Sequence, residues 1–349
     1  MRVLIATVRT PFISGGAEAH ADELLQALLA GGHQAEILSV PFNPSEAECI
    51  PDQMLACRLL DLREIDGVPV DRVIALKFPS YFIRHPHKVI WLLHQYRGAY
   101  DLWEHEMGGL RSAPRGRMVR DIIRQADRGM AAGARAIYTN SSNVSQRLRH
   151  FSGIEAPALY HPPPQADSFF CADRTEDYFF YPSRLSRTKR QELVLRALAL
   201  TREPVRMKFA GRADSPAFGQ QLRELAHTLG LGKRVEWLGF INDDEKRGLY
   251  ASARAIVFPP LDEDYGYITL EAMLASKPVI TCDDSGGPLA FILPNETGSV
   301  TQPTAERLAA AMDALWRDSA LAARCGQAAR RHYQSLNLSW SHVVKTLLA

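Results

Sequence analysis

The chain has 349 residues, which is more than one ordinary hydrophobic core holds and enough for two α/β domains. Hydrophobic residues make up 46% of it, so two cores can be buried, and a formal net charge of +2 gives no indication of a nucleic-acid partner. The five cysteines are scattered without a CxxC pair, which indicates neither a zinc site nor a disulfide framework and fits a reducing compartment. No run of about 18 apolar residues is present, so no membrane-spanning helix is expected.

Short apolar runs rich in β-branched residues alternate with amphipathic helical stretches along the chain. The predicted strands are residues 3–6, 35–39, 72–75, 89–93 and 136–139 in the first half, and 179–181, 207–210, 235–238, 255–258 and 278–282 in the second. Helical patterns at 19–30, 193–200, 219–229 and 305–316 fall between them. This alternation predicts an α/β fold with parallel, doubly wound sheets.

A run of three prolines, Pro162 to Pro164, divides the pattern, because prolines remove backbone donors and fix φ. We therefore expect an N-terminal domain of residues 1–163 and a C-terminal domain of residues 164–334. The last segment, residues 335–349, contains an amphipathic helix at 340–348 and is expected to pack back on the N-terminal domain.

The most informative segment follows the predicted strand 255–258 and enters a helix that we expect at 270–275. Glu263 lies on the loop after the strand, where open α/β sheets bind ligands, and Gly266 allows the backbone to approach a ligand closely. We expect Glu271 in the first turn of the helix. A carboxylate accepts two hydrogen bonds from a vicinal diol, so Glu271 suits a ribose and Glu263 a hexose.

The two carboxylates should lie roughly 10 Å apart, about the span of a folded nucleotide sugar. The amides of residues 265–269 are expected to be the unpaired donors of a helix N-terminus, which suits an anionic or hydroxyl-rich ligand. A structural interpretation stays open, in which Glu271 favours the helix dipole and Glu263 is a solvated loop charge.

The spacing of Glu263 and Glu271, followed by Ala272-Met273, resembles that of the retaining glycosyltransferases of family 4, among the glycosyl transferases group 1. The resemblance implies the GT-B fold, two Rossmann-like domains that face each other across a cleft. It also implies that the C-terminal domain holds a nucleotide-sugar donor. The donor-binding residues there would be Gly239, Phe240, Asp264, Tyr265, Gly266, Tyr267, Ile268 and Glu271.

Two cations, Arg184 and Lys189, stand five residues apart on the loop after the predicted strand 179–181, where both can converge on one pyrophosphate. The run resembles the family's Arg-Leu-x-x-x-Lys element, whose cations hold the donor diphosphate. The alternative is a solvated basic turn. The family usually has Gly where Ser183 and Arg190 stand.

In the first half, the run from Ser14 to Glu18 follows the first predicted strand, and its residues Gly15-Gly16-Ala17-Glu18 match the family's Gly-Gly-Ala-Glu loop. The resemblance implies that the Gly16 amide contacts the β-phosphate of the donor. His94 follows directly on the strand at 89–93, and the resemblance implies that it contacts the donor sugar and the acceptor. A satisfied core histidine is the structural alternative. Tyr100 and Arg97 are assigned to the acceptor side as a hypothesis.

Residues 111–149 hold nine arginines and only two acids, Asp121 and Asp127. Arg117, Arg120, Arg124 and Arg128 recur at helical spacing beside an apolar face, a pattern typical of helices that lie on anionic lipid. An Arg-rich solvated face and an acceptor-phosphate groove are the alternatives.

From the resemblance we expect a metal-independent hexosyltransferase that retains anomeric configuration and transfers a hexose from a nucleotide-diphosphate sugar to a hydroxyl acceptor. Its catalytic residues would be His94, Arg184, Lys189 and Glu263, with no cofactor. The acceptor would be a sugar, a lipid-linked glycan or a small molecule, in cell-surface polysaccharide, lipopolysaccharide or other glycan synthesis. We expect a cytoplasmic protein, with peripheral contact at the inner face of the membrane through residues 111–149.

Other functions also fit parts of this pattern. A nucleotide-sugar epimerase of the same fold would need no acceptor, and a non-catalytic nucleotide-sugar binding protein is consistent with Ala290, which stands where the family commonly has Glu. A glycoside hydrolase would need Glu263 and Glu271 on opposite sides of one glycosidic bond. Base recognition in such folds is largely through the main chain, so the side chains select neither the nucleotide nor the sugar.

Overall fold

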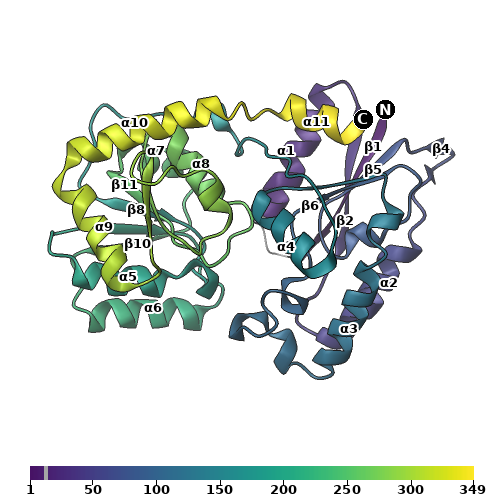
Figure 1. Cartoon of the computed structure of the whole chain (residues 1–349), viewed down its shortest axis with the longest axis horizontal. Helices are drawn as coiled ribbons and strands as arrows, with labels where there is room; N and C mark the ends of the chain where they lie inside the picture. Colours follow the sequence, from purple (N-terminus) through teal and green to yellow (C-terminus); the bar gives the residue numbers. More distant parts are fainter. Residues whose placement is uncertain (12–14) are drawn as a thin grey trace. The chain divides into compact units, whose positions relative to one another are not determined.

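The computed structural model describes residues 1–11 and 15–349, which divide into two compact units (Figure 1). Unit 1 comprises Met1–Pro164 with Leu338–Ala349, and unit 2 comprises Gln165–Asn337. These limits lie one and three residues from the expected ones. The second limit is later because helix α10 (Ser319–Ser335) runs beyond residue 334.

Unit 1 is built, within its described residues, on a five-stranded parallel sheet in the order β2-β1-β5-β6-β7. A two-residue antiparallel pair, β3 with β4, is separate from it. The strands are β1 (Arg2–Arg9), β2 (Gln34–Pro41), β3 (Glu64–Ile65), β4 (Val68–Pro69), β5 (Arg72–Ala75), β6 (Lys88–Leu92) and β7 (Ala136–Thr139). The helices are α1 (Gly16–Ala30), α2 (Ile50–Leu59), α3 (Gly116–Asp127), α4 (Ser142–Ser152) and α11 (Trp340–Leu348).

Successive residues of the central strands in unit 1 are buried on opposite faces of the sheet. Ile74 packs in the cluster that contains Leu24 of α1 and Val343 of α11. Its neighbour Val73 packs in the cluster that contains Ile123 of α3. Burial on both faces explains why these strands are continuous apolar runs in the sequence rather than alternating ones.

Helix α11 lies beside α1 in unit 1, as Figure 1 shows in yellow and purple. The Trp340 ring lies 6.3 Å from that of His20 on α1. At the other end of α11, the buried Arg72 donates hydrogen bonds to the carbonyls of Leu347 (3.4 Å), Leu348 (2.9 Å) and Ala349 (3.3 Å). The last carbonyls of a helix have no partner within it, so Arg72 satisfies groups that burial would otherwise leave unpaired.

Unit 2 contains a six-stranded parallel sheet in the order β10-β9-β8-β11-β12-β13. Its strands are β8 (Phe179–Pro182), β9 (Met207–Ala210), β10 (Val235–Gly239), β11 (Ala255–Val257), β12 (Val279–Cys282) and β13 (Gly298–Thr301). Its helices are α5 (Gln191–Leu200), α6 (Pro216–Thr228), α7 (Asp243–Ser252), α8 (Tyr267–Leu274), α9 (Ala305–Arg317) and α10. The two doubly wound parallel sheets confirm the predicted fold class.

A buried carboxylate anchors the loop after β6, which carries His94. Asp127, at the end of α3, accepts hydrogen bonds from the hydroxyls of Tyr81 (2.8 Å) and Tyr100 (2.6 Å) and from the Gln95 amide group (3.0 Å). It is 1% exposed. Burial raises the pKa of Asp127 from 3.8 to about 6, although the three donors oppose that shift.

This shift predicts a pH dependence of stability with a defined sign. The folded protein binds the Asp127 proton more tightly than the unfolded chain, so the contribution is complete below about pH 4 and is lost as pH rises through about 6. The loss should approach about 3 kcal/mol in the free energy of unfolding. Thermal unfolding of the wild type and of Asp127→Asn from pH 4 to pH 8 measures it.

We expect the difference in the free energy of unfolding between the wild type and Asp127→Asn to change between pH 4 and pH 8. The control is Asp121→Asn on the exposed side of α3, which should follow the wild-type profile. Parallel profiles for wild type and Asp127→Asn would contradict the assignment.

Candidate functional site

The strand order defines a ligand-binding edge in each sheet. In unit 2 the chain passes from β8 outward to β9 and β10, then returns to the other side of β8 and continues outward through β11, β12 and β13. Open α/β sheets bind ligands beyond the carboxyl ends of the strands, where the order reverses. That point lies between β8 and β11, and the loops after these two strands carry Lys189 and Glu263.

Backbone hydrogen bonds join three loops at this edge of unit 2. The Leu261 amide donates to the Thr188 carbonyl (2.7 Å), which ties the loop after β11 to the loop after β8. The Glu263 amide donates to the Ser285 carbonyl (3.0 Å), and the Gly287 amide donates to the Glu263 carbonyl (2.7 Å), both from the loop after β12. The main chain of Glu263 is therefore held on both sides.

Glu263 forms an ion pair with Lys189 across the point where the strand order reverses. The two side chains are 23% and 16% exposed, so each retains access to solvent. The Lys189 ammonium also lies 5.5 Å from the centre of the Phe258 ring, and the Tyr181 hydroxyl donates to the Lys189 carbonyl. The sequence assigns Glu263 and Lys189 to the same ligand, and the fold brings these two side chains into direct contact.

Arg184 does not share this contact. Its Nε lies 3.1 Å from Oδ1 of Asp214, and the two side chains are 54% and 43% exposed. Lys189 and Arg184 therefore contact different carboxylates, Glu263 and Asp214. Their convergence on one diphosphate stays a prediction.

Glu271 lies in the second turn of α8, and the expectation that it belongs to the first turn is wrong because the helix begins at Tyr267. Its carboxylate accepts hydrogen bonds from the Tyr250 hydroxyl (2.7 Å) and the Lys246 ammonium (3.1 Å), both on α7. The Glu271 side chain is 7% exposed. Burial, with the charge of Glu271, raises the Tyr250 pKa well above its ordinary value, so this hydroxyl stays a donor. Glu271 is a fixed, nearly buried acceptor rather than a solvated charge at a helix start.

The turn between Glu263 and α8 requires glycine. Gly266 has a φ of +91°, and a Cβ there would lie 2.8 Å from Cγ of Pro288. Asp264 and Tyr265 precede this turn, and Tyr267 and Ile268 begin the helix. The predicted set of unpaired amides over residues 265–269 was too wide, because the Thr269 amide donates to the Gly266 carbonyl (3.0 Å).

Gly239 and Phe240 lie at the carboxyl end of β10, along the same edge. The Gly239 carbonyl accepts from the Gly211 amide (2.7 Å), which links the ends of β10 and β9. Phe240 is 68% exposed, and the Arg212 guanidinium lies over its ring at 4.7 Å. An exposed aromatic ring beside a cation suits a stacked base, and sequence reasoning missed Arg212 because nothing in its local pattern marks it.

Sequence reasoning also missed the role of Arg190 and Asp284. Arg190 has a φ of +57°, a left-handed conformation that favours glycine. Its two terminal nitrogens lie 2.7 and 2.6 Å from the two carboxylate oxygens of Asp284. Asp284 therefore pairs with Arg190 and joins the loops after β12 and β8. The sequence signal that could have indicated this left-handed position is that Arg190 stands where the family usually has Gly.

In unit 1 the strand order reverses between β1 and β5. Gly15 is the N-cap of α1, and its amide donates to the Glu18 carboxylate (2.8 Å), which also pairs with Lys77 (3.3 Å) after β5. Gly16 is the first residue of α1. Ser14 of the predicted loop lies outside the described residues.

His94 follows β6 and is partly buried at the same edge of unit 1. Its Nδ1 lies 2.7 Å from the Gln95 carbonyl, which can only accept, so Nδ1 carries the proton of this hydrogen bond. Tyr100, assigned to the acceptor side as a hypothesis, is instead a core residue that donates to Asp127, and Arg97 pairs with Asp101 (2.6 Å).

The basic helix α3 does not present all four of its periodic arginines to solvent. The Arg120 guanidinium lies 4.3 Å from the centre of the Trp103 ring, and that of Arg124 lies 5.8 Å from the Tyr100 ring. Arg117 and Arg128 are exposed. Among the described residues, no helix combines the length and the apolar character needed to cross a bilayer.

Comparison with known proteins gives the following matches. The family model described as glycosyl transferases group 1 matches residues 168–332. An uncharacterized glycosyltransferase, MJ1607 of Methanocaldococcus jannaschii, is 33% identical over 127 residues, which are 36% of this chain and 31% of that protein. The chain thus spans about a third of the length of this relative.

Two solved structures match almost the whole chain. Sucrose-phosphate synthase from Thermosynechococcus elongatus has a TM-score of 0.79 at 18% identity, covering 99% of this chain and 97% of that one. HepE of Anabaena, solved in complex with UDP and glucose, has a TM-score of 0.71 at 18% identity and covers 99% of both chains. At this identity the likeness establishes the fold, that of GT-B glycosyltransferases.

The Arg190–Asp284 pair predicts a compensated strain that a double-mutant cycle can measure. Asp284→Asn should lower the free energy of unfolding by about 1 kcal/mol, because it removes a partly exposed bidentate pair and leaves the left-handed arginine without it. Adding Arg190→Gly to that variant should restore about 1 kcal/mol by removing the strain. Thermal or urea unfolding gives both values.

The matched control is Asp283→Asn on the exposed neighbouring side chain, which should stay within about 0.5 kcal/mol of the wild type. If Arg190→Gly destabilises the Asp284→Asn background further, the strain assignment is wrong.

Proposed function

We propose that the chain, whose residues 168–332 match the glycosyl transferases group 1 model, is a retaining glycosyltransferase that transfers a hexose from a nucleotide-diphosphate sugar to a hydroxyl acceptor. The observation that carries the proposal is the contact of Lys189 with Glu263 at the reversal point of unit 2, together with the fixed carboxylate of Glu271 on the helix that follows the Glu263 loop. A cation and two acceptors along one edge match the diphosphate, hexose and ribose of one donor.

In this proposal Lys189 turns from Glu263 to the donor diphosphate, and Glu263 accepts hydrogen bonds from hexose hydroxyls. The bond between the anomeric carbon and the diphosphate oxygen breaks, and the acceptor oxygen bonds to that carbon from the same face. The departing diphosphate takes the acceptor proton, so configuration is retained without a protein nucleophile. Lys189 lowers the barrier by stabilising the negative charge that develops on the leaving group, and Arg184 would add to it by releasing Asp214.

Glu271 would bind the ribose hydroxyls, because its carboxylate retains acceptor positions beyond the two filled by Tyr250 and Lys246. Gly239 and Phe240 would contact the base. HepE of Anabaena, which shares the fold, was solved with UDP and glucose, so UDP-glucose is the first donor to test. The roles assigned to Gly15, Gly16 and His94 in unit 1 stay predictions.

The proposed reaction uses the chain's own cations where other enzymes use a divalent metal. No group of three or more His, Cys, Asp or Glu side chains suited to hold a metal ion lies within residues 1–11 and 15–349. We further propose that the acceptor belongs to cell-surface polysaccharide, lipopolysaccharide or another glycan, and that the reaction takes place in the cytoplasm.

The first test is Lys189→Ala. Loss of the ammonium should lower kcat by about 100-fold, the scale of removing one preorganised group that stabilises transition-state charge. Steady-state rates with a panel of nucleotide sugars and acceptors measure it. Lys233→Ala, which removes the same charge from an exposed position before β10, should leave kcat unchanged.

Full activity in Lys189→Ala would overturn the assignment of Lys189 to the diphosphate. Because this variant leaves Glu263 without its partner, thermal unfolding of Lys189→Ala itself shows whether a loss of activity reflects a loss of folding. We expect Lys189→Ala to remain folded and to be inactive.

The second test follows donor binding in excess EDTA. A bound donor stabilises the folded state in proportion to its occupancy, so the shift in Tm with UDP-, GDP- or ADP-sugars should identify the donor and survive the chelator. NMR of the product should show the anomeric configuration of the donor. A new sugar isomer formed from donor alone would favour an epimerase, and donor binding without turnover on any acceptor would favour a binding protein.

A further inference from the structure

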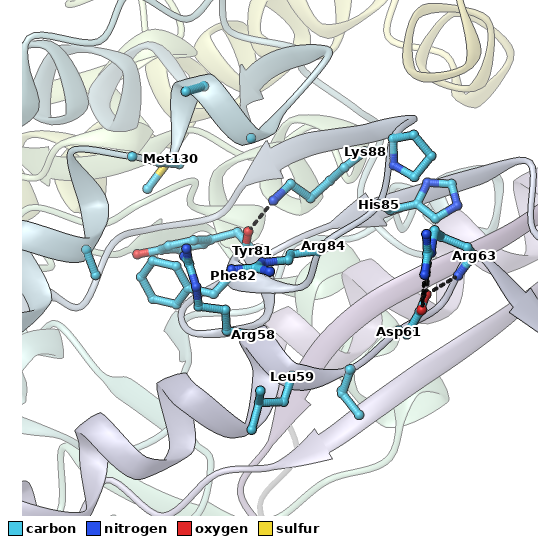
Figure 2. A pocket seen from close by; sticks show the side chains of 16 residues that line it. Arg58, Leu59, Asp61, Arg63, Tyr81, Phe82, Arg84, His85, Lys88 and Met130 are labelled. Atoms are coloured by element: carbon cyan, nitrogen blue, oxygen red, sulfur yellow. Dashed lines mark hydrogen bonds and ion pairs between the residues drawn. The ribbon is translucent and has the colours of Figure 1, made fainter.

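Unit 1 contains a cavity of about 680 Å³ that the proposed function does not use (Figure 2). Its lining comes from the last turn of α2 and the segment after it, from the end of α3, and from the segments that lead into β6 and β7. The cavity therefore lies at the amino ends of these strands. His94 and the Gly15 turn lie at the carboxyl ends, on the opposite edge of the sheet.

The charge of this cavity is strongly positive. Arg58, Arg84 and Lys88 line it, and all three are labelled in Figure 2. Asp61 is the one acidic side chain in the lining, and it is already paired with Arg63 at 2.6 Å. Within the described residues, neither Arg58 nor Arg84 forms an ion pair.

Lys88 supplies a fixed cation at the base of the cavity. It is 4% exposed, and its ammonium donates to the carbonyls of Tyr81 (2.7 Å) and Ile83 (2.9 Å), the first of which is drawn in Figure 2. An ammonium has three protons, so one donor remains. A Cβ at Gly133 would lie 3.4 Å from this nitrogen, so the glycine keeps the approach open. Burial, with the charge of Arg58, lowers the Lys88 pKa to about 8.

Apolar side chains lie beside these cations. Leu59 lines the cavity and is 73% exposed, and the buried Phe82 and Met130 complete an apolar wall. The cavity volume is in the range of small-molecule sites, which combine apolar walls with a few placed polar groups. Its occupant should be an anion that carries an apolar portion.

We propose that this cavity binds a small organic phosphate, with the phosphate against Arg58, Arg84 and Lys88 and the organic portion against Leu59 and Phe82. A phosphate monoester carries close to two negative charges and three acceptor oxygens, so it matches three cations better than a carboxylate does. Guanidinium groups bind phosphate oxygens through parallel hydrogen bonds. The same chemistry occurs in soluble phosphate esters and in the headgroup of a lipid phosphate.

The experiment is isothermal titration of the full chain with inorganic phosphate, glycerol 3-phosphate and short-chain dihexanoyl phosphatidate, at fixed ionic strength. We expect at least one of the two organic phosphates to bind more tightly than inorganic phosphate. In the double variant Arg58→Ala/Arg84→Ala its Kd should rise at least about tenfold, the effect of losing one charge-assisted contact. Both arginines are exposed, so their removal should leave the fold intact, which circular dichroism checks.

Two matched proteins make the result specific. Arg117→Ala/Arg331→Ala removes the same charge from exposed positions outside the cavity and should bind as the wild type does. Lys189→Ala should also bind normally, because the proposed diphosphate contact lies in unit 2. Saturating UDP should not compete.

The outcomes separate the sources of the ligand. Equal binding of glycerol 3-phosphate and phosphatidate identifies a soluble phosphate ester, and binding of phosphatidate alone identifies a lipid phosphate. Either supports the proposal when the arginine pair is required. It is overturned if no organic phosphate binds below about 10 mM, if Arg58→Ala/Arg84→Ala binds as the wild type does, or if Lys189→Ala abolishes binding.

Discussion

All strands of a parallel sheet end along the same edge, and the two faces of such a sheet are covered by helices. This constraint leaves an edge as the place where loops from distant parts of the sequence meet a ligand. In unit 2 it brings together the loops after β8, β11 and β12, which backbone hydrogen bonds then join to one another. Lys189 and Glu263 are 74 positions apart in the chain and contact each other because of it.

The charges along this edge are paired within the protein. Ion pairs join a cation to a carboxylate: Lys189 with Glu263, Arg184 with Asp214, and Arg190 with Asp284. Glu271 forms an ion pair with Lys246 and accepts a hydrogen bond from Tyr250. Partly buried charges without partners would destabilise the fold, so each carboxylate orients one cation. In the proposed function, the diphosphate and hydroxyls of the donor replace these internal partners. The extent of burial differs, from half-exposed Arg184 to nearly buried Glu271.

The two edges of the sheet in unit 1 differ in their chemistry. At the carboxyl edge the polar groups are matched to one another, as Glu18 is to Gly15 and Lys77. At the amino edge Arg58, Arg84 and Lys88 line a cavity whose one acidic side chain, Asp61, forms an ion pair with Arg63. Asp127 meanwhile fixes the segment between these edges by holding Tyr81, Tyr100 and Gln95. In unit 1 the polar groups at the carboxyl ends of the strands are therefore paired with one another, whereas the amino ends carry excess positive charge.

The sequence by itself determined the α/β class, the doubly wound sheets and the long strands, because strands buried on both faces are continuous apolar runs between turn residues. It also placed Glu263, Lys189 and Gly266 on loops after strands. It did not reveal β13, because Gly298–Thr301 is a short edge strand without an apolar run. It placed α8 three residues late, because a helix start after a left-handed glycine depends on packing against Pro288.

Only the tertiary structure decided the partners of the charged side chains. The spacing of Arg184 and Lys189 along the chain predicted that both contact one pyrophosphate. In the structure Arg184 pairs with Asp214 and Lys189 pairs with Glu263. Tyr100 was assigned to the acceptor side as a hypothesis, and the fold buries it with its hydroxyl donating to Asp127. The physical reason is that a pattern along the chain fixes which face of an element a residue occupies. The atom that it contacts belongs to another element, whose position is set by long-range packing.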